Sequence, residues 1–288
     1  MKWTPGDRSG IEDYRGRSGM RVGAPIGLGG LLVLLLLSWF TGVDFLSLLG
    51  GGGSAPPSAS VGTSGQVATS PQEEKMVDFV GAVMDDAQRT WRELLGDRYQ
   101  ETRTRLFRES IQSGCGFAQA ATGPFYCPAD HRIYLDLTFF DELHRRFGAP
   151  GDFAQAYVLA HELGHHVQSL VGTEGRVRES QQAVPSNRNA LSVRLELQAD
   201  CYAGVWGHHA AQKGRAASGG VELEEGDIDE ALRAAAAIGD DRLQRMSSGR
   251  VNPESFTHGS SEQRVTWFTT GFRSGNPEVC NTFQTGTH

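Results

Sequence analysis

The sequence predicts an α+β fold that is mainly α, with a small β-sheet, preceded by one transmembrane helix. Several long stretches after residue 72 carry apolar residues at helical spacing. The clearest strand, residues 133–140, is short and rich in β-branched and aromatic residues. Residues 22–43 contain no charge and are about as long as a helix that crosses a bilayer. With 288 residues, 39% of them hydrophobic, the chain can form one domain with a substantial core.

The chain divides into four predicted segments. They are a polar cytoplasmic segment at 1–21, a membrane anchor at 22–43, a flexible Gly/Ser/Pro linker at 44–71 and a folded domain at 72–288. Basic residues outnumber acidic ones by five to three before the apolar span. The positive-inside rule therefore predicts a single-pass inner-membrane protein whose folded domain is periplasmic or extracellular. A cleavable signal peptide is the alternative, but the length of the apolar segment favours an uncleaved anchor.

The folded domain is predicted to open with an amphipathic helix. Ser70 and Glu73 form a capping box around Pro71, and apolar residues then recur at helical spacing until Gly96 ends the run. Residues 99–107 alternate weakly between polar and apolar and predict a second strand. These patterns are explained by packing alone.

The most informative stretch is a HExxH motif at residues 161–165, inside a helix predicted from Asp152, as its cap, to Gly172. His161 and His165 are four residues apart, so both imidazoles lie on one face, within reach of one metal ion. Glu162 lies beside that face, where a carboxylate can take a proton from a water that the metal activates. This set of side chains most often indicates Zn²⁺.

A second helix, predicted at about 186–212, carries two carboxylates at the same spacing. Glu196 can supply the third ligand that an open catalytic zinc site requires. Asp200, one turn later, can accept a hydrogen bond from a ligand imidazole and so fix its tautomer. The alternative is that both carboxylates lie on a solvated face. The intervening segment, 172–190, is predicted to be an exposed loop.

The strings HELGHH and ELQADCYAG resemble the bacterial YpfJ-like neutral zinc metallopeptidases, and the HExxH…ExxAD layout is similar to that of the wider gluzincin group. The resemblance runs from about residue 72 into the C-terminal region. It implies a zincin-like metallopeptidase domain with zinc on His161, His165 and Glu196, Glu162 as the catalytic acid/base and Asp200 as the orienting carboxylate. In such folds an edge strand borders the substrate cleft, which would assign residues 133–140 to peptide binding; an ordinary core strand is the alternative.

The C-terminal part predicts a helix at 227–246 and a capped helix after Ser260. His258 lies in the turn before the second of these. That turn resembles the THPS…R element of HtpX-type peptidases, with Gly259 where proline is usual. The resemblance implies a catalytic His258 that stabilises an oxyanion, whereas a lone histidine in a loop is more often a surface residue.

The four cysteines predict two disulfides, because an extracytoplasmic compartment is oxidising and their spacing suits no metal site. Three connectivities are possible. In one of them Cys115–Cys127 closes a short loop and Cys201–Cys280 ties the C-terminal tail to the second metal helix. The net charge of −7, without a basic aromatic cluster, argues against nucleic-acid binding.

These observations together predict a membrane-anchored zinc metallopeptidase that acts on a peptide or protein substrate and contacts the membrane through its N-terminal helix. The alternative is a non-catalytic, zinc-stabilised module that binds or scaffolds other molecules outside the cytoplasm. A structural zinc site would have no need of Glu162, so the complete motif favours the enzyme.

Overall fold

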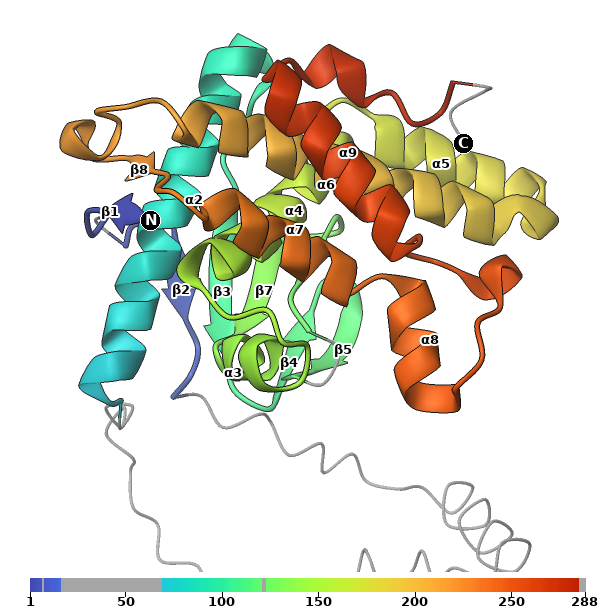
Figure 1. Cartoon of the computed structure of the whole chain (residues 1–288), viewed down its shortest axis with the longest axis horizontal. Coiled ribbons are helices and arrows are strands. Elements are labelled where there is room, and N and C mark those ends of the chain that lie inside the picture. Colours follow the sequence, from blue (N-terminus) through green and yellow to red (C-terminus); the bar gives the residue numbers. More distant parts are fainter. Residues whose placement is uncertain (7, 17–68, 121–122, 285–288) are drawn as a thin grey trace, which may run out of the picture. The chain divides into compact units, whose positions relative to one another are not determined.

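The computed structural model describes residues 1–6, 8–16, 69–120 and 123–284 (Figure 1). One compact unit comprises Met1–Arg15 and Ala68–His288. The anchor predicted at 22–43 lies outside the described residues, as does the predicted linker as far as residue 68. Within the described ranges, no helix combines the length and the apolar character needed to cross a membrane.

Helices dominate the unit, and a central one carries the HExxH motif. This helix, α4 (Asp152–Leu170), contacts strands on one side and α6 (Arg188–Ala210) on the other, while α2 (Pro71–Leu95) and α7 (Asp227–Ala237) also pack on it. The last long helix, α9 (Ser261–Ser274), lies along α6 (Figure 1). Mainly helical structure with small sheets is therefore confirmed.

Glycines allow α6 and α9 to approach closely. A Cβ on Gly204 would lie 2.0 Å from the carbonyl oxygen of Phe268, and one on Gly271 would lie 1.9 Å from that of Cys201. Both distances are shorter than atoms tolerate, so only glycine permits this backbone contact. The contact holds α9 against the part of α6 that carries Glu196 and Asp200.

The main sheet has four strands in the order β2-β3-β7-β6, namely β2 (Ile11–Asp13), β3 (Arg103–Phe107), β7 (Arg132–Asp136) and β6 (Phe125–Cys127). The pairs β2–β3 and β3–β7 are parallel, and β6 is antiparallel to β7. Two small sheets pair β1 (Lys2–Trp3) with β8 (Val221–Glu222), and β4 (Ser110–Ser113) with β5 (Gly116–Gln119).

The strand predicted at 133–140 is therefore shorter than expected and lies inside the sheet. Its second half becomes α3 (Thr138–Arg145), because Asp136 Oδ1 accepts hydrogen bonds from the N–H and the hydroxyl of Thr138 and so starts a helix there. The edge strand on this side is β6, which the sequence analysis did not identify.

Residues 1–15 do not form a separate segment, as the predicted boundary at 1–21 implied, but are part of the folded unit. We call them the N-terminal arm. The arm supplies β1 and β2 to two sheets, and the ring of Trp3 packs edge-on against Phe79. Buried Arg15 forms ion pairs with Asp13, Glu73 and Glu74. The arm's partners lie far along the chain, so local sequence patterns do not reveal that the arm docks on the domain.

Three local predictions are also corrected. The segment 172–190 is not a loop but contains α5 (Thr173–Ala183) and a 3₁₀ turn, η3 (Pro185–Asn187), before α6 begins. The helix expected at 227–246 is two helices, α7 and α8 (Asp240–Ser248). Between them the backbone at Gly239 packs directly against the backbone of Ser261, and the chain changes direction at this contact. Gly151, not Asp152, is the N-cap residue of α4.

Other boundaries agree with expectation. Ser70 accepts a hydrogen bond from the N–H of Glu73 with Pro71 at the first helical turn, and Gly96 ends α2. Ser260 and Gln263 form the capping box of α9. The remaining short 3₁₀ turns are η1 (Gly96–Arg98), η4 (Ala216–Ser218), η5 (Pro253–Ser255) and η6 (Pro277–Cys280).

Both disulfides are present with the pairing Cys115–Cys127 and Cys201–Cys280. The first joins the turn before β5 to strand β6. The second joins α6 to η6, across 79 residues of sequence. Two disulfides are confirmed, and of the three possible connectivities this is the one that closes the short loop.

Candidate metal centre

Two helices bring three potential metal ligands together. His161 and His165 project from α4, and Glu196 projects from α6. His161 Nε2 lies 3.2 Å from Glu196 Oε2, and His165 Nε2 lies 3.5 Å from Glu196 Oε1. Ligand atoms arranged tetrahedrally around zinc at its usual bond lengths stand about 3.3 Å apart. These three side chains therefore fit a zinc ion.

Gly164, the second x of the HExxH motif, sets the spacing between the two helices. A Cβ at this position would lie 3.0 Å from the carbonyl oxygen of Ala199 and 3.1 Å from its Cα. Both are backbone atoms of α6, which cannot move aside as a flexible side chain would. Gly164 thereby allows Glu196 to reach the two histidines.

A buried polar cluster lies behind His161. Asp200 Oδ1 accepts a hydrogen bond from His161 Nδ1 at 2.9 Å and another from the hydroxyl of Tyr157. Arg264, from α9, donates to both carboxylate oxygens of Asp200 at 2.8 and 2.9 Å. Because Asp200 only accepts, His161 donates from Nδ1, and Nε2, the nitrogen that faces Glu196, is the one that can bind a metal ion.

Tyr157 and Arg264 were not assigned to the site from the sequence. Arg264 is the arginine at the end of the stretch that resembles THPS…R. One signal could have identified it: no arginine or lysine of α6 lies within one turn of Asp200, so a buried Asp200 requires a cation from elsewhere in the fold.

The electrostatics of the cluster favour a cation between the histidines and Glu196. Burial alone would lower the pKa of His161, but the carboxylates of Asp200 and Glu196 raise it to about 10. Burial would likewise raise the pKa of Glu196, but His165 and His161 hold it well below its usual range. A site that attracts a proton this strongly also attracts a metal ion that competes for the same nitrogen.

Glu162 is buried beside the three ligands. Burial raises the pKa of its carboxyl, although His165 and His161 oppose this and the backbone N–H of Tyr126 donates to the carboxylate. Tyr126 belongs to β6, so the motif helix and the edge strand meet at this carboxylate. A carboxyl whose pKa moves toward neutrality is suited to exchange protons with a substrate.

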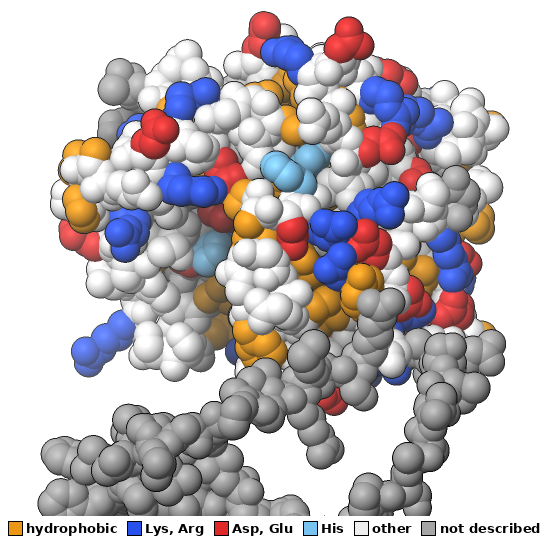
Figure 2. Space-filling view, turned by 180° about the vertical axis from the view of Figure 1, so that it is seen from behind, with side chains coloured by type: hydrophobic (Ala, Val, Ile, Leu, Met, Phe, Trp, Pro, Cys, Tyr) orange, Lys and Arg blue, Asp and Glu red, His pale blue; other side chains and the backbone are white. Residues whose placement is uncertain are grey.

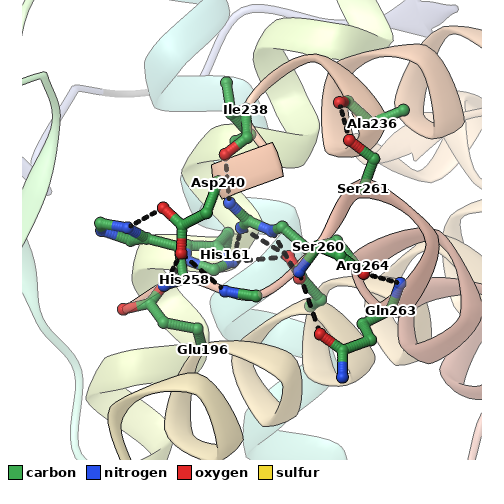
Figure 3. Close-up of polar contacts among 12 residues, drawn as sticks. His161, Glu196, Ala236, Ile238, Asp240, His258, Ser260, Ser261, Gln263 and Arg264 are labelled. Carbon is green, nitrogen blue, oxygen red and sulfur yellow. Dashed lines mark hydrogen bonds and ion pairs between the residues drawn. The ribbon is translucent and has the colours of Figure 1, made fainter. Parts of the chain in front are cut away.

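His258 reaches the same region from the turn between α8 and α9. Its Nδ1 lies 3.2 Å from Asp240 Oδ1, while Asp240 Oδ2 accepts the backbone N–H of His258 at 2.6 Å (Figure 3). The hydrogen bond that Asp240 accepts from the imidazole raises the pKa of His258. The side chain is 52% exposed, so it lies at the opening of the site and is not a fourth buried ligand.

A cleft of about 910 Å³ joins these residues. Its floor contains His161, Glu162, His165 and Glu196, and His258 lies on its wall. Large apolar side chains form much of the remainder, among them Pro124, Phe125, Phe139, Phe147, Leu243 and Met246. On the face shown in Figure 2, basic and acidic side chains are interspersed among hydrophobic ones. The cleft can therefore accept a substrate with apolar side chains next to a polar reacting group.

The structure thus brings together every predicted site residue: His161, Glu162, His165, Glu196, Asp200 and His258. Two histidines and a glutamate on neighbouring helices, beside a small sheet and a deep cleft, define the general class of a zinc peptidase. The solvated-face alternative for Glu196 and Asp200 does not hold. Asp200 is buried and pairs with Arg264, and Glu196 pairs with His161.

Comparison with known proteins gives the family. Residues 1–283 match the model of the family described as "Putative neutral zinc metallopeptidase", and the chain belongs to this family. It is 46% identical to the uncharacterized protein YpfJ of Escherichia coli K12 over 296 aligned residues, which cover 98% of this chain and 99% of that protein. It is 47% identical to the uncharacterized protein Rv2575 of Mycobacterium tuberculosis H37Rv over 67% of this chain and 66% of that protein. No solved structure matches the chain significantly.

Proposed function

We propose that this protein is a zinc-dependent peptidase in which His161, His165 and Glu196 hold the metal. One observation carries the proposal: both Nε2 atoms converge on Glu196 while both Nδ1 atoms face hydrogen-bond acceptors, Asp200 and Gln168. Because both Nδ1 atoms already face acceptors, the two Nε2 atoms can bind one metal ion once that ion displaces the proton shared between His161 and Glu196. The family supports zinc as the metal.

Glu162 is the proposed acid and base. A zinc ion held here would polarise the carbonyl of a substrate and make a water molecule more acidic. Glu162 accepts the proton of the attacking water and then delivers it to the departing amine, which its raised pKa favours. Asp200 keeps His161 in the tautomer that the site needs, and Arg264 keeps Asp200 ionised, since the pKa of Asp200 is lowered against the effect of burial.

His258 is proposed to stabilise the oxyanion that forms when water attacks the carbonyl. Asp240 engages Nδ1, so Nε2 is the nitrogen that can donate to a substrate oxygen in the cleft. The pairing with Asp240 favours the protonated, donating form of the imidazole. Such donors typically contribute about 10²–10³ in rate.

The substrate proposed is an extended peptide or a protein segment bound along β6. In the described part of the sheet this strand pairs on one side only, with β7, and residues 123–126 and 128 line the cleft. An edge strand offers its free backbone groups to a peptide that adds to the sheet. The apolar walls of the cleft favour large hydrophobic side chains near the bond that is cleaved.

The proposed location is an oxidising compartment outside the cytoplasm, with attachment to the inner membrane through residues 22–43. The two disulfides support this compartment, because the cytoplasm keeps thiols reduced. The membrane attachment rests on the sequence of the apolar segment alone.

The deciding experiment compares the parent with Glu162→Gln, both loaded with zinc, against a library of peptides and a bacterial proteome. We expect equal zinc content and a loss of cleavage by several orders of magnitude in the variant, because the base is gone. Equal cleavage by the two proteins would remove Glu162 from the mechanism. A parent that binds zinc, becomes more stable and cleaves nothing would instead favour the non-catalytic module.

A further inference from the structure

The two metal-binding histidines are supported in different ways. His161 Nδ1 faces the carboxylate of Asp200, whereas His165 Nδ1 faces a neutral amide: it lies 2.9 Å from Oε1 of Gln168, on the next turn of α4. Gln168 is completely buried. A buried amide that touches a metal ligand must have all of its polar groups satisfied, so the partners of Gln168 decide what it does.

The orientation of Gln168 follows from a carbonyl group. Its Nε2 lies 2.7 Å from the carbonyl oxygen of Leu195, the residue before Glu196. A carbonyl only accepts hydrogen bonds, so the NH₂ end of the amide must face Leu195 and the oxygen end must face His165. His165 therefore donates from Nδ1, and the lone pair of its Nε2 is left for the metal.

A second amide continues the chain of hydrogen bonds. Gln168 Nε2 also lies 3.2 Å from Oε1 of Gln198, and Gln198 Nε2 donates to the carbonyl oxygen of Cys280 at 2.8 Å. The carbonyl of Cys280 fixes the orientation of the Gln198 amide in the same way, so that Oε1 of Gln198 faces Gln168. Cys280 is held in place by its disulfide to Cys201, three residues after Gln198 on α6.

We propose that Gln168 and Gln198 are positioning residues that hold His165 in its metal-binding tautomer, and that the Cys201–Cys280 disulfide fixes the far end of this chain. The proposal rests on the zinc site of the proposed function. It adds a dependence of metal affinity on a disulfide whose nearer cysteine adjoins Asp200. Reduction of this one disulfide to two thiols by a dithiol, which is itself oxidised to a disulfide, would then weaken zinc binding and link the metal content of the protein to the redox state of its surroundings.

The test is the zinc dissociation constant of the full-length chain, measured by competition with a chelator. Gln168→Met, which keeps the length but not the hydrogen bonds, should weaken zinc binding by about 10- to 100-fold. Gln168→Glu, in its protonated form, keeps an oxygen for His165 Nδ1 and a donor for the carbonyl of Leu195, and should recover most of the affinity. Gln88→Met is the matched control, because Gln88 is a buried glutamine that bonds to Tyr99 and Thr102, apart from the metal centre.

The disulfide is tested with two matched double variants. Cys201→Ala with Cys280→Ala should weaken zinc binding several-fold, because Gln198 loses its fixed partner. Cys115→Ala with Cys127→Ala removes the other disulfide and should leave the affinity unchanged. Melting temperatures of the metal-free proteins show whether each variant folds.

Equal zinc affinity in the parent and in Gln168→Met would overturn the proposal, as would equal losses in Gln168→Met and Gln168→Glu. An effect of the same size from both disulfide variants would overturn the part that concerns Cys201–Cys280. Zinc affinity is measured without substrate. A parent that binds zinc but cleaves no peptide would therefore refute the peptidase function and leave this inference standing.

Discussion

At the scale of residues, the site depends on which nitrogen of each imidazole donates a hydrogen bond and which one faces the metal. A metal ligand needs a free lone pair on one nitrogen and a proton on the other, and only an acceptor behind the ring secures that arrangement. Asp200 supplies the acceptor for His161, and Gln168 supplies it for His165. The side chains behind the metal ligands are therefore as specific a feature of this site as the ligands themselves.

The ligand assignment predicts the behaviour of His165→Ala. We expect the purified variant to lose stoichiometric zinc, because two remaining ligands hold the ion too weakly. Elemental analysis after dialysis measures this. His258→Ala is the control: it should retain one zinc per chain and lose activity only. Full zinc occupancy in His165→Ala would refute the assignment.

The Asp200–Arg264 pair predicts a large stability effect. Arg264→Met leaves the carboxylate of Asp200 buried beside His161 and Tyr157 without its cation, which should cost about 3–5 kcal/mol of unfolding free energy. Adding Asp200→Asn to Arg264→Met removes the unpaired charge, so the double variant should be more stable than the sum of the two single losses predicts. Urea unfolding of the metal-free proteins measures the unfolding free energies of the two single variants and the double variant. Additive losses would mean that the two side chains do not interact.

At the scale of elements, the metal centre is a contact between α4 and α6. Gly164 lets the two helix backbones touch, and the contact of Gly204 and Gly271 presses α9 onto the other side of α6. Arg264 reaches Asp200 only because α9 is so close. The positions of the ligands thus follow from helix packing, for which the small residues are essential.

Gly164→Ala tests this packing. The added methyl group would meet the backbone of Ala199, and we expect a loss of about 1–3 kcal/mol in unfolding free energy from overpacking. Because α6 must move away from α4, zinc affinity should fall as well, even though no ligand has changed. Gly175→Ala, on α5, meets nothing within 4 Å and is the control. A Gly164→Ala protein with normal zinc affinity would show that the site tolerates a wider helix spacing.

The contact between the N-terminal arm and α2 predicts a dependence on pH. Hydrogen bonds from Arg8 and Arg15 lower the pKa of Glu74. A carboxyl with a lowered pKa in the folded state stabilises that state above its unfolded pKa, about 4.3, and the benefit disappears as the pH falls through the folded value. Melting temperatures of the parent and Glu74→Gln should therefore differ at pH 7 and converge by about pH 3. A constant difference across this range would exclude the ionised carboxylate as the cause.

At the scale of the whole molecule, the docked arm constrains how the protein can be placed in a membrane. The chain leaves the folded unit after Arg15 and returns to it at Ala68. With the arm docked, both points belong to one compact body. A single crossing by residues 22–43, with the N-terminus in the cytoplasm and the domain outside, would require the arm to leave its pairing with β3 and β8 of the domain.

Topology can be measured with one epitope tag at each end of the full-length chain. If the arm docks as in the structure, both tags should have the same accessibility to protease or antibody in spheroplasts. Tags on opposite sides would restore the single-pass arrangement that the charge distribution predicts, and would mean that the arm leaves its place on the sheet in the membrane-bound protein.

The sequence by itself indicated the candidate ligands, the candidate acid/base residue and the outer limits of several helices, because these depend on local rules. Two histidines four residues apart share a face of any α-helix, and Ser70, Gly96 and Ser260 act on backbone groups within a single turn. Two disulfides were also expected from the four cysteines, but three connectivities stayed open until the structure showed the pairing.

Only the tertiary structure decided which distant groups support that motif. Arg264 lies 64 residues from Asp200, and Cys280 lies 82 residues from Gln198. The arm's Glu12 pairs with Arg105 and Arg132, and β6 rather than β7 forms the edge beside Glu162. Such contacts are set by how helices and strands pack to fill a common core, and sequence periodicity records which face of an element is buried but not which partner buries it.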